Sequence, residues 1–123
     1  MSNLVTVIVA IGVFSVALLF IGVINAPSVS GLLPPQNFIA KSIASDAILL
    51  SWTYSKPDNI KGFLIYRRIN NGKWNLLTTI KNPYITSYLD LNIKSNTKYS
   101  YYIVTHKDVF LSKPSTILEV SIP

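Results

Sequence analysis

Residues 86–104 read TSYLDLNIKSNTKYSYYIV, and this stretch is the most informative about the fold. Large apolar side chains recur at every second position, from Tyr99 through Tyr101 to Ile103. A period of two is that of a β-strand with one buried face. A second strand is predicted just upstream, at residues 85–89, with polar turn residues between the two. The stretch therefore predicts two strands joined by a turn, with Tyr99 and Tyr101 in the core.

The same alternation with a period of two occurs in most of the chain that follows Phe38. Ile48, Leu50 and Trp52 alternate toward one face of residues 47–54. The sequence Asn70-Asn71-Gly72 predicts a hairpin, because Asn and Gly tolerate positive φ. Further strands are predicted at residues 62–69, with Phe63 and Ile65 facing inward, at 74–80, at 99–105 and at 117–122. About seven strands with turns between them are typical of an all-β sandwich.

These residues resemble a fibronectin type III module, an immunoglobulin-like sandwich, over about residues 35–123. The matching segments are Pro34-Pro35, Leu50-Ser51-Trp52, residues 61–67 and residues 86–104. In the last segment Ile93 takes the family's leucine position and Tyr99 its tyrosine corner, while Ser95 replaces a frequent proline. The predicted core consists of Ile48, Leu50, Trp52, Phe63, Ile65, Tyr88, Ile93, Tyr99, Tyr101 and Ile103. A fold with so many uses does not name a function.

The N-terminal part has a different composition. Residues 1–40 carry no charged side chain, whereas all eleven Lys/Arg and all five Asp/Glu lie between Lys41 and Glu119. The apolar run at residues 4–24 predicts a helix that would span roughly 30 Å, the thickness of a bilayer core. Three regions follow from this composition. They are a hydrophobic helix at residues 1–26, a Pro/Ser/Gly connector at 27–35 and the β-sandwich at 36–123.

Four interpretations of the apolar run remain open: a signal peptide, a single-span membrane anchor, a buried helix of a multimer and a filament-core helix. A signal peptide fits poorly, because no Lys or Arg precedes the run and its length exceeds the usual apolar region; a buried helix of this length is rare in a soluble multimer. The run also lacks a polar face, which excludes an amphipathic surface helix. Small residues that would let helices pack closely are Thr6, Ala10, Gly12, Ser15, Ala17 and Gly22.

With the β-module behind it, residues 4–22 resemble the N-terminal helix of an archaeal type IV pilus subunit. The resemblance implies a helix that sits in the membrane before assembly and then bundles with its copies in the filament core. The β-domains would lie outside, at the cell surface, with adhesion as the expected role. Val5 stands where bacterial relatives carry glutamate, and removal of a leader before Met1 would account for the missing basic-Gly processing site. The alternative is a single-span anchored binding module or an accessory subunit of a membrane complex.

No catalytic pattern emerges from the polar residues. The chain has no cysteine, no metal-ligand spacing and no phosphate-binding loop. His106 with Asp108 is interpreted as a solvated turn, and Asp46 and Asp58 as turn residues. We therefore expect no enzyme activity, no cofactor and no metal.

The charge and the aromatic residues bear on possible partners. The net charge is +6, but apart from Arg67-Arg68 the basic residues are scattered, so no nucleic-acid partner is expected. Tyr66, Trp74, Tyr84 and Tyr102 are candidates for outward-facing aromatics. Such a row would bind a surface glycan or a partner protein, or it would be ordinary cross-strand pairing, and the sequence leaves these alternatives open. The partner expected on the strength of the helix is the chain itself.

Overall fold

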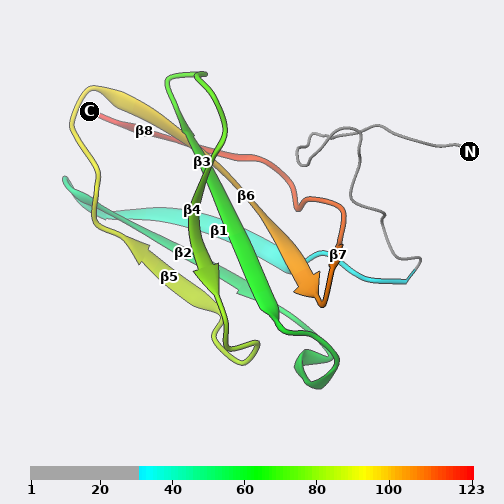
Figure 1. Cartoon of the computed structure of the whole chain (residues 1–123). Coiled ribbons are helices and arrows are strands. Elements are labelled where there is room, and N and C mark those ends of the chain that lie inside the picture. The colour runs from blue at the N-terminus through cyan, green and yellow to red at the C-terminus, as the bar shows by residue number, and fades with distance from the viewer. Residues whose placement is uncertain (1–30) are drawn as a thin grey trace, which may run out of the picture. The chain divides into compact units, whose positions relative to one another are not determined.

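A computed structural model describes residues 31–123 (Figure 1). It contains eight strands and one 3₁₀ turn, η1 (Pro57–Asn59). The strands are β1 (Gln36–Ala44), β2 (Ala47–Thr53), β3 (Gly62–Ile69), β4 (Asn75–Ile80), β5 (Ser87–Asp90), β6 (Thr97–Lys107), β7 (Phe110–Leu111) and β8 (Leu118–Ile122). Residues 33–107 and 113–123 form one compact unit, and residues 108–112, which include β7, belong to a second unit.

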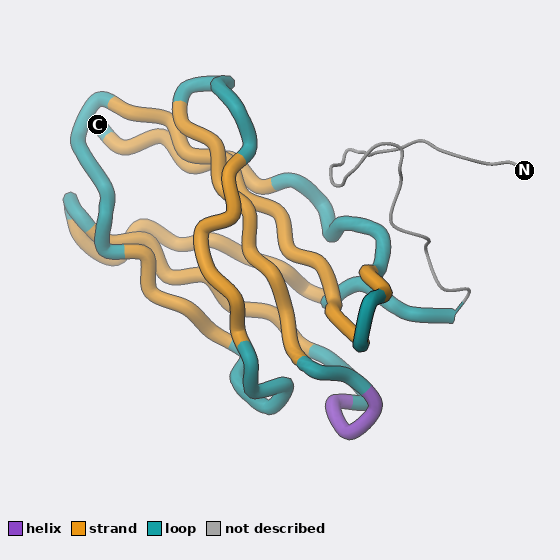
Figure 2. The backbone as a smooth tube through the Cα atoms, in the orientation of Figure 1, coloured by secondary structure: helices purple, strands orange, loops and turns teal. Residues whose placement is uncertain are grey.

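The strands form two layers, visible as two groups of strands in Figure 2. One sheet has three strands in the order β1-β2-β5. The other sheet has five strands: β4, β3, β6 and β7 in that order, and β8, which pairs with β6. The strand pairs of the sandwich are antiparallel. The all-β sandwich predicted from the period of two is confirmed, with eight strands where about seven were expected; the added one is the two-residue β7.

The core lies between the two sheets and is built from alternate residues of each strand. In β6 the inward side chains of Tyr99, Tyr101 and Ile103 are at most 1% exposed. Trp52 of β2 contacts Phe63 of β3 edge to face, with ring centroids 5.4 Å apart, so the indole joins the two layers. The other buried apolar residues include Phe38, Ala47, Ile48, Leu50, Ile60, Ile65, Ile80, Ile93, Val104 and Ile122.

One turn and the start of one strand depend on unusual backbone geometry. Asn70 and Asn71 have φ of 50° and 62°, and the Gly72 amide donates to the Ile69 carbonyl at 2.8 Å. Two positive φ angles in a two-residue turn match the twist of the flanking strands. At the start of β3, Gly62 has φ of 154°, and a Cβ atom there would lie 1.8 Å from the Ile80 carbonyl oxygen. This close approach of β3 and β4 requires glycine.

Several predictions concern residues that the structure places differently or does not describe. The predicted helix at 1–26, with Thr6, Ala10, Gly12, Ser15, Ala17 and Gly22, lies outside the described residues. Within residues 31–123, no helix has the length and apolar character needed to cross a membrane. His106 lies in β6 opposite Gly62 and not in a turn. Tyr88 is half-buried, although it was predicted as a core residue, because it lies on the four-residue edge strand β5.

Candidate functional site

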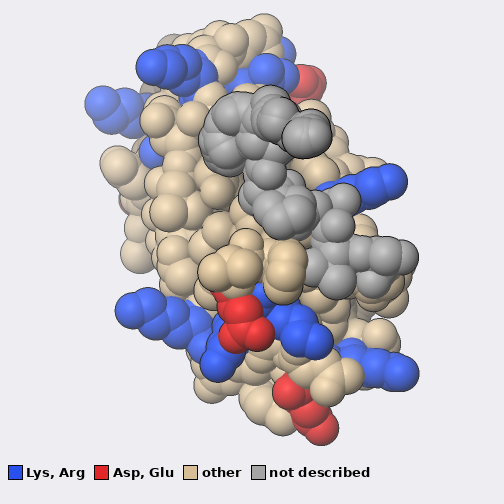
Figure 3. Space-filling view, turned by 45° about the vertical axis from the view of Figure 1, so that its right-hand side comes forward, with Lys and Arg blue, Asp and Glu red and all other residues tan. Residues whose placement is uncertain are grey.

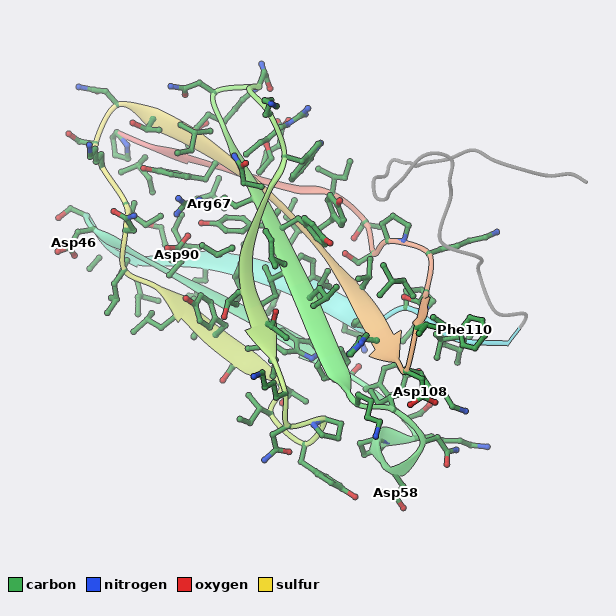
Figure 4. The ribbon with its side chains drawn as sticks, viewed as in Figure 1. Asp46, Asp58, Arg67, Asp90, Asp108 and Phe110 are labelled. Carbon is green, nitrogen blue, oxygen red and sulfur yellow. The ribbon has the colours of Figure 1, made fainter. Side chains whose placement is uncertain are left out.

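Two adjacent arginines of β3 define two different polar environments in the sandwich. Successive side chains of a strand point to opposite faces. Arg67 therefore points into the sandwich toward β5, whereas Arg68 lies on the outer face of the five-stranded sheet. Figure 4 shows Arg67 and Asp90 lying close together. Arg67 thus belongs to the interior of the module, whereas Arg68 is half-buried on its outer face.

The interior environment is a polar cluster centred on Asp90. The Arg67 guanidinium donates to the Asp90 carboxylate at 2.9 Å and to the Asn92 carbonyl at 3.3 Å. The Asp90 carboxylate also accepts a hydrogen bond from the Tyr101 hydroxyl at 2.8 Å and one from the Asn92 backbone amide at 3.2 Å. Burial and the hydrogen bond to Asp90 raise the pKa of the Tyr101 hydroxyl above its ordinary value. Asp90 is only 1% exposed, so this cluster joins the sheets and is closed to a ligand.

The outer environment is a cluster of half-buried aromatic rings around Arg68. Tyr66 and Tyr102 are cross-strand partners on β3 and β6, and their rings stack with centroids 4.9 Å apart and planes 14° apart. Trp74, which follows the β3–β4 turn, meets Tyr102 edge to face at 4.7 Å. The Arg68 guanidinium carbon lies 4.7 Å from the centroid of the Trp74 ring. We call Tyr66, Arg68, Trp74 and Tyr102 the aromatic face.

The polar groups of the aromatic face are poorly satisfied. Arg68 has no hydrogen bond or ion pair to any described residue, and its Nε atom is buried without an acceptor. Its cross-strand partner Ser100 is fully buried, and the Ser100 Oγ atom also has no partner among residues 31–123. Burial raises the pKa of the Tyr66 and Tyr102 hydroxyls, so both remain protonated donors at neutral pH. The face therefore offers hydrogen-bond donors and a cation.

A second solvent-facing surface lies on the opposite side of the sandwich. On the three-stranded sheet, Leu49 is the cross-strand partner of both Lys41 and Leu89, on the outer face. Ile39, Ile43 and Leu89 are exposed and Leu49 is half-buried. We call Ile39, Ile43, Leu49 and Leu89 the aliphatic face. The sandwich thus has an apolar surface on each of its two outer sides.

The structure brings together only some of the residues singled out from the sequence. Tyr66, Trp74 and Tyr102 form one cluster, but Tyr84 lies elsewhere, with its hydroxyl bonded to Asp58. The hydrogen bond to Asp58 raises the pKa of the Tyr84 hydroxyl. Asp58 belongs to η1 and Asp46 to the turn between β1 and β2, at separate places in Figure 4.

The predicted core and corner residues have definite places as well. Ile48, Leu50, Trp52, Phe63, Ile65, Ile93, Tyr99, Tyr101 and Ile103 are buried. The Tyr99 hydroxyl accepts a hydrogen bond from the Lys94 amide at 2.8 Å, the contact of a tyrosine corner. No group of three His, Cys, Asp or Glu residues suited to a metal ion occurs between residues 31 and 123.

Sequence reasoning missed the roles of Asp90, Ser100 and the two arginines. The period of two does predict that Arg67 and Arg68 point to opposite faces, and this was the feature of the sequence from which their different roles could have been inferred. It does not predict their partners, because these come from other strands. Figure 3 shows Lys and Arg side chains spread over the visible surface and not gathered into one basic patch.

The comparisons with known proteins agree with this architecture. A model of the fibronectin type III domain matches residues 33–121. No curated protein matches the chain. Among solved structures, one described as a myokine structure has a TM-score of 0.63 and 15% identity, over 73% of this chain and 96% of that one.

Two further structures belong to longer proteins. The kinase region of twitchin from C. elegans has a TM-score of 0.63 and 22% identity, over 79% of this chain and 17% of that one. The FN1-FN3 domains of chicken CNTN1 have a TM-score of 0.63 and 20% identity, over 70% of this chain and 30% of that one. At these identities the likeness concerns the fold alone. Since the family model matches well over half of its length, the chain belongs to the fibronectin type III family.

Proposed function

We propose that this chain is a structural, non-catalytic subunit of an extracellular helical filament similar to an archaeal type IV pilus. The N-terminal apolar segments would pack in the filament core after leaving the membrane, and the fibronectin type III modules would cover the outside and serve adhesion. The single observation that carries this proposal is the charge-free run of residues 1–40 preceding the module. The family contributes a generic binding or structural module.

The apolar run supplies the free energy for removing the N-terminal segment from water, but much less for transferring it from lipid to a filament core. Removing about twenty apolar side chains from water is worth roughly 1.5–3 kcal/mol each, tens of kcal/mol per subunit before costs. Lipid is almost as apolar as a helix bundle, so leaving the membrane recovers little of this. Close helix packing at small residues such as Ala10 and Ala17 would then favour the filament, because it allows backbones to approach.

The outer surfaces of the module are compatible with a polymer. The aromatic face and the aliphatic face lie on opposite sides of the sandwich and differ in composition. A contact between unlike surfaces is heterologous, and such contacts form rings or open helical filaments. This geometry supports repeated packing of modules around a core, although the N-terminal run carries the proposal.

Electron microscopy of material sheared from the cell surface tests the proposal. Ala10→Trp should abolish filaments, because the larger ring prevents close helix approach, while the melting temperature of the β-module stays unchanged. Leu19→Trp is the matched control, since position 19 would lie on the opposite side of a helix from position 10 and already carries a large residue. Normal filaments from Ala10→Trp would refute packing of this segment in the core.

The second candidate is a single-span anchored binding module or an accessory subunit of a membrane complex. The solvent-facing aromatic face with its cation favours it, because that surface suits binding without polymerisation. Membrane fractionation separates the two candidates. A detergent-extracted monomer without sheared filaments would support the anchor and contradict the filament.

A further inference from the structure

We infer that the aromatic face binds an acidic polysaccharide, with Arg68 pairing to a carboxylate or sulfate group and the tyrosine hydroxyls bonding to neighbouring sugar oxygens. The inference goes beyond the filament proposal, and its test does not depend on that proposal, because it is made on dissolved single chains, in which no neighbouring module covers the aromatic face. It names a ligand class for a surface built by β3, β6 and the residues before β4.

Arg68 lacks a negatively charged neighbour among the described residues. Its guanidinium is half-buried against Trp74, and it has no acceptor or anion among the described residues. A ring contact replaces only part of the lost hydration of a partly buried cation, and an anionic group that accepts its hydrogen bonds removes the remaining cost. The neighbouring Arg67 shows the contrast, because its charge is matched by Asp90 at 2.9 Å. Arg68 is therefore the group that would gain most from an external anion.

The acidic residues of the chain are too few to balance its basic residues. The chain has eleven Lys/Arg and five Asp/Glu. Of the acids, Asp90 is enclosed, Glu119 lies 3.8 Å from Lys98, and Asp58 is bonded to Tyr84. The other two acids, Asp46 and Asp108, are exposed, but the acids of a second copy are outnumbered by its eleven Lys/Arg, so a copy brings no net negative charge to Arg68. Charge complementarity therefore favours an acidic ligand of a different kind.

The arrangement of the rings favours a sugar chain over a nucleic acid as the ligand. Single-stranded nucleic acids bind by stacking bases on free aromatic faces. Here the rings of Tyr66 and Tyr102 already stack on each other, and Arg68 lies over Trp74. What remains for a ligand is the cation and two tyrosine hydroxyls that make no hydrogen bond to any described residue. Hydroxyl and guanidinium donors suit the oxygen-rich surface of an acidic sugar.

The experiment is titration calorimetry of the full-length chain in a non-ionic detergent. The acidic probes are polygalacturonate and chondroitin sulfate, and the neutral probe is dextran. We expect the acidic probes to bind, with affinity that falls as salt is raised, and dextran not to bind. Arg68→Gln should weaken acidic binding about tenfold, because it removes the charge-assisted hydrogen bonds.

Two further variants keep the test decisive. Lys94→Gln removes the same charge from an exposed position outside the aromatic face and should change affinity less than about twofold. Tyr102→Phe keeps the ring stack and removes one hydroxyl, so it should weaken binding about threefold with little change in melting temperature. Should Arg68→Gln melt early, Tyr102→Phe decides the question alone.

Several results would overturn the inference. These are no binding of either acidic probe, equal losses in Arg68→Gln and Lys94→Gln, an unchanged affinity in Tyr102→Phe, or equally tight binding of dextran. A single-stranded oligothymidine that binds more tightly than both polysaccharides, and loses affinity in Arg68→Gln, would assign the face to nucleic acid. Because each readout is a binding constant of the dissolved chain, none of them depends on whether filaments form.

Discussion

At the scale of single residues, the interior tyrosine of the Asp90 cluster shows how burial controls a titratable group. The Tyr101 hydroxyl is enclosed and donates to a carboxylate, so its ionised form is disfavoured in the folded state. The pKa of Tyr101 is thus higher when folded than the ordinary value of 10.0 expected when unfolded. Its contribution to stability is fully present below the unfolded pKa and is lost as the pH rises toward the folded pKa.

This difference predicts an alkaline loss of stability. The free energy of unfolding should stay nearly constant from neutral pH to about pH 9 and fall above about pH 10. Tyr101→Phe should lower stability at neutral pH and make the alkaline decline shallower, because phenylalanine does not titrate; the raised pKa values of Tyr66 and Tyr102 leave the rest of the decline. Chemical denaturation at several pH values measures both effects. Tyr88→Phe serves as control, because Tyr88 lies outside the cluster; an equally flattened decline in that variant would contradict the assignment.

At the scale of elements, the pairing of β3 with β4 depends on one backbone position. Gly62 begins β3 and lies against the carbonyl of Ile80 at the end of β4. Along the same pair, Ile65 is opposite Thr78 whereas Tyr66 is opposite Leu76, so Leu77 is an extra residue in β4. A bulge of this kind bends the strand and changes its twist. The hairpin that carries Trp74 is therefore set by a local irregularity.

The crowding at Gly62 predicts a strong effect of a single methyl group. Gly62→Ala should destabilise the module by about 3 kcal/mol or more, because the new Cβ would meet backbone and the φ angle is unfavourable for alanine. Gly31→Ala is a control for a positive φ without a contact: Gly31 has φ of 88°, no atom lies within 4 Å of an added Cβ, and the residue lies outside the compact unit, so no loss is expected there. Thermal unfolding compares the two. Equal losses would mean that the backbone angle, and not the contact with Ile80, determines the cost.

At the scale of the whole sandwich, the two sheets are held together by apolar packing and by one polar connection. Asp90 comes from the three-stranded sheet, and Arg67 and Tyr101 come from the five-stranded sheet. Buried ion pairs contribute little net stability compared with apolar residues, but removing one partner leaves a costly unpaired charge. The Asp90 cluster therefore contributes more to the alignment of the two sheets than to the free energy of unfolding.

That reasoning predicts a large asymmetry between single and double variants. Asp90→Ala should cost about 3–5 kcal/mol, because the Arg67 charge stays buried without its partner. Adding Arg67→Met should restore a substantial part of the loss, since both charges are then absent. Urea unfolding of Asp90→Ala, Arg67→Met and the double variant measures the difference. A double variant as unstable as the sum of both single changes would show that no charge coupling exists.

The sequence by itself determined the class of fold and the faces of the strands. Alternation at Ile48, Leu50 and Trp52 and at Tyr99, Tyr101 and Ile103 is a local property, because the pleat of each strand sends successive side chains to opposite sides. The positive φ of Asn70 and Asn71 is likewise encoded locally. The charge-free N-terminal run was also evident from composition alone, and the function proposed for it rests there.

Only the tertiary structure decided which side chains meet. Arg67 finds Asp90 across 23 positions of the chain, and Tyr66 stacks on Tyr102 through the register of β3 with β6. Alternation specifies a face, but the register and the bulge in β4 arise from the packing of all strands at once. For this reason Tyr84, which was predicted to lie in the aromatic row, lies elsewhere, and Arg68, which was not predicted there, belongs to the aromatic face. Contacts between distant segments are a property of the folded chain, and no local pattern contains them.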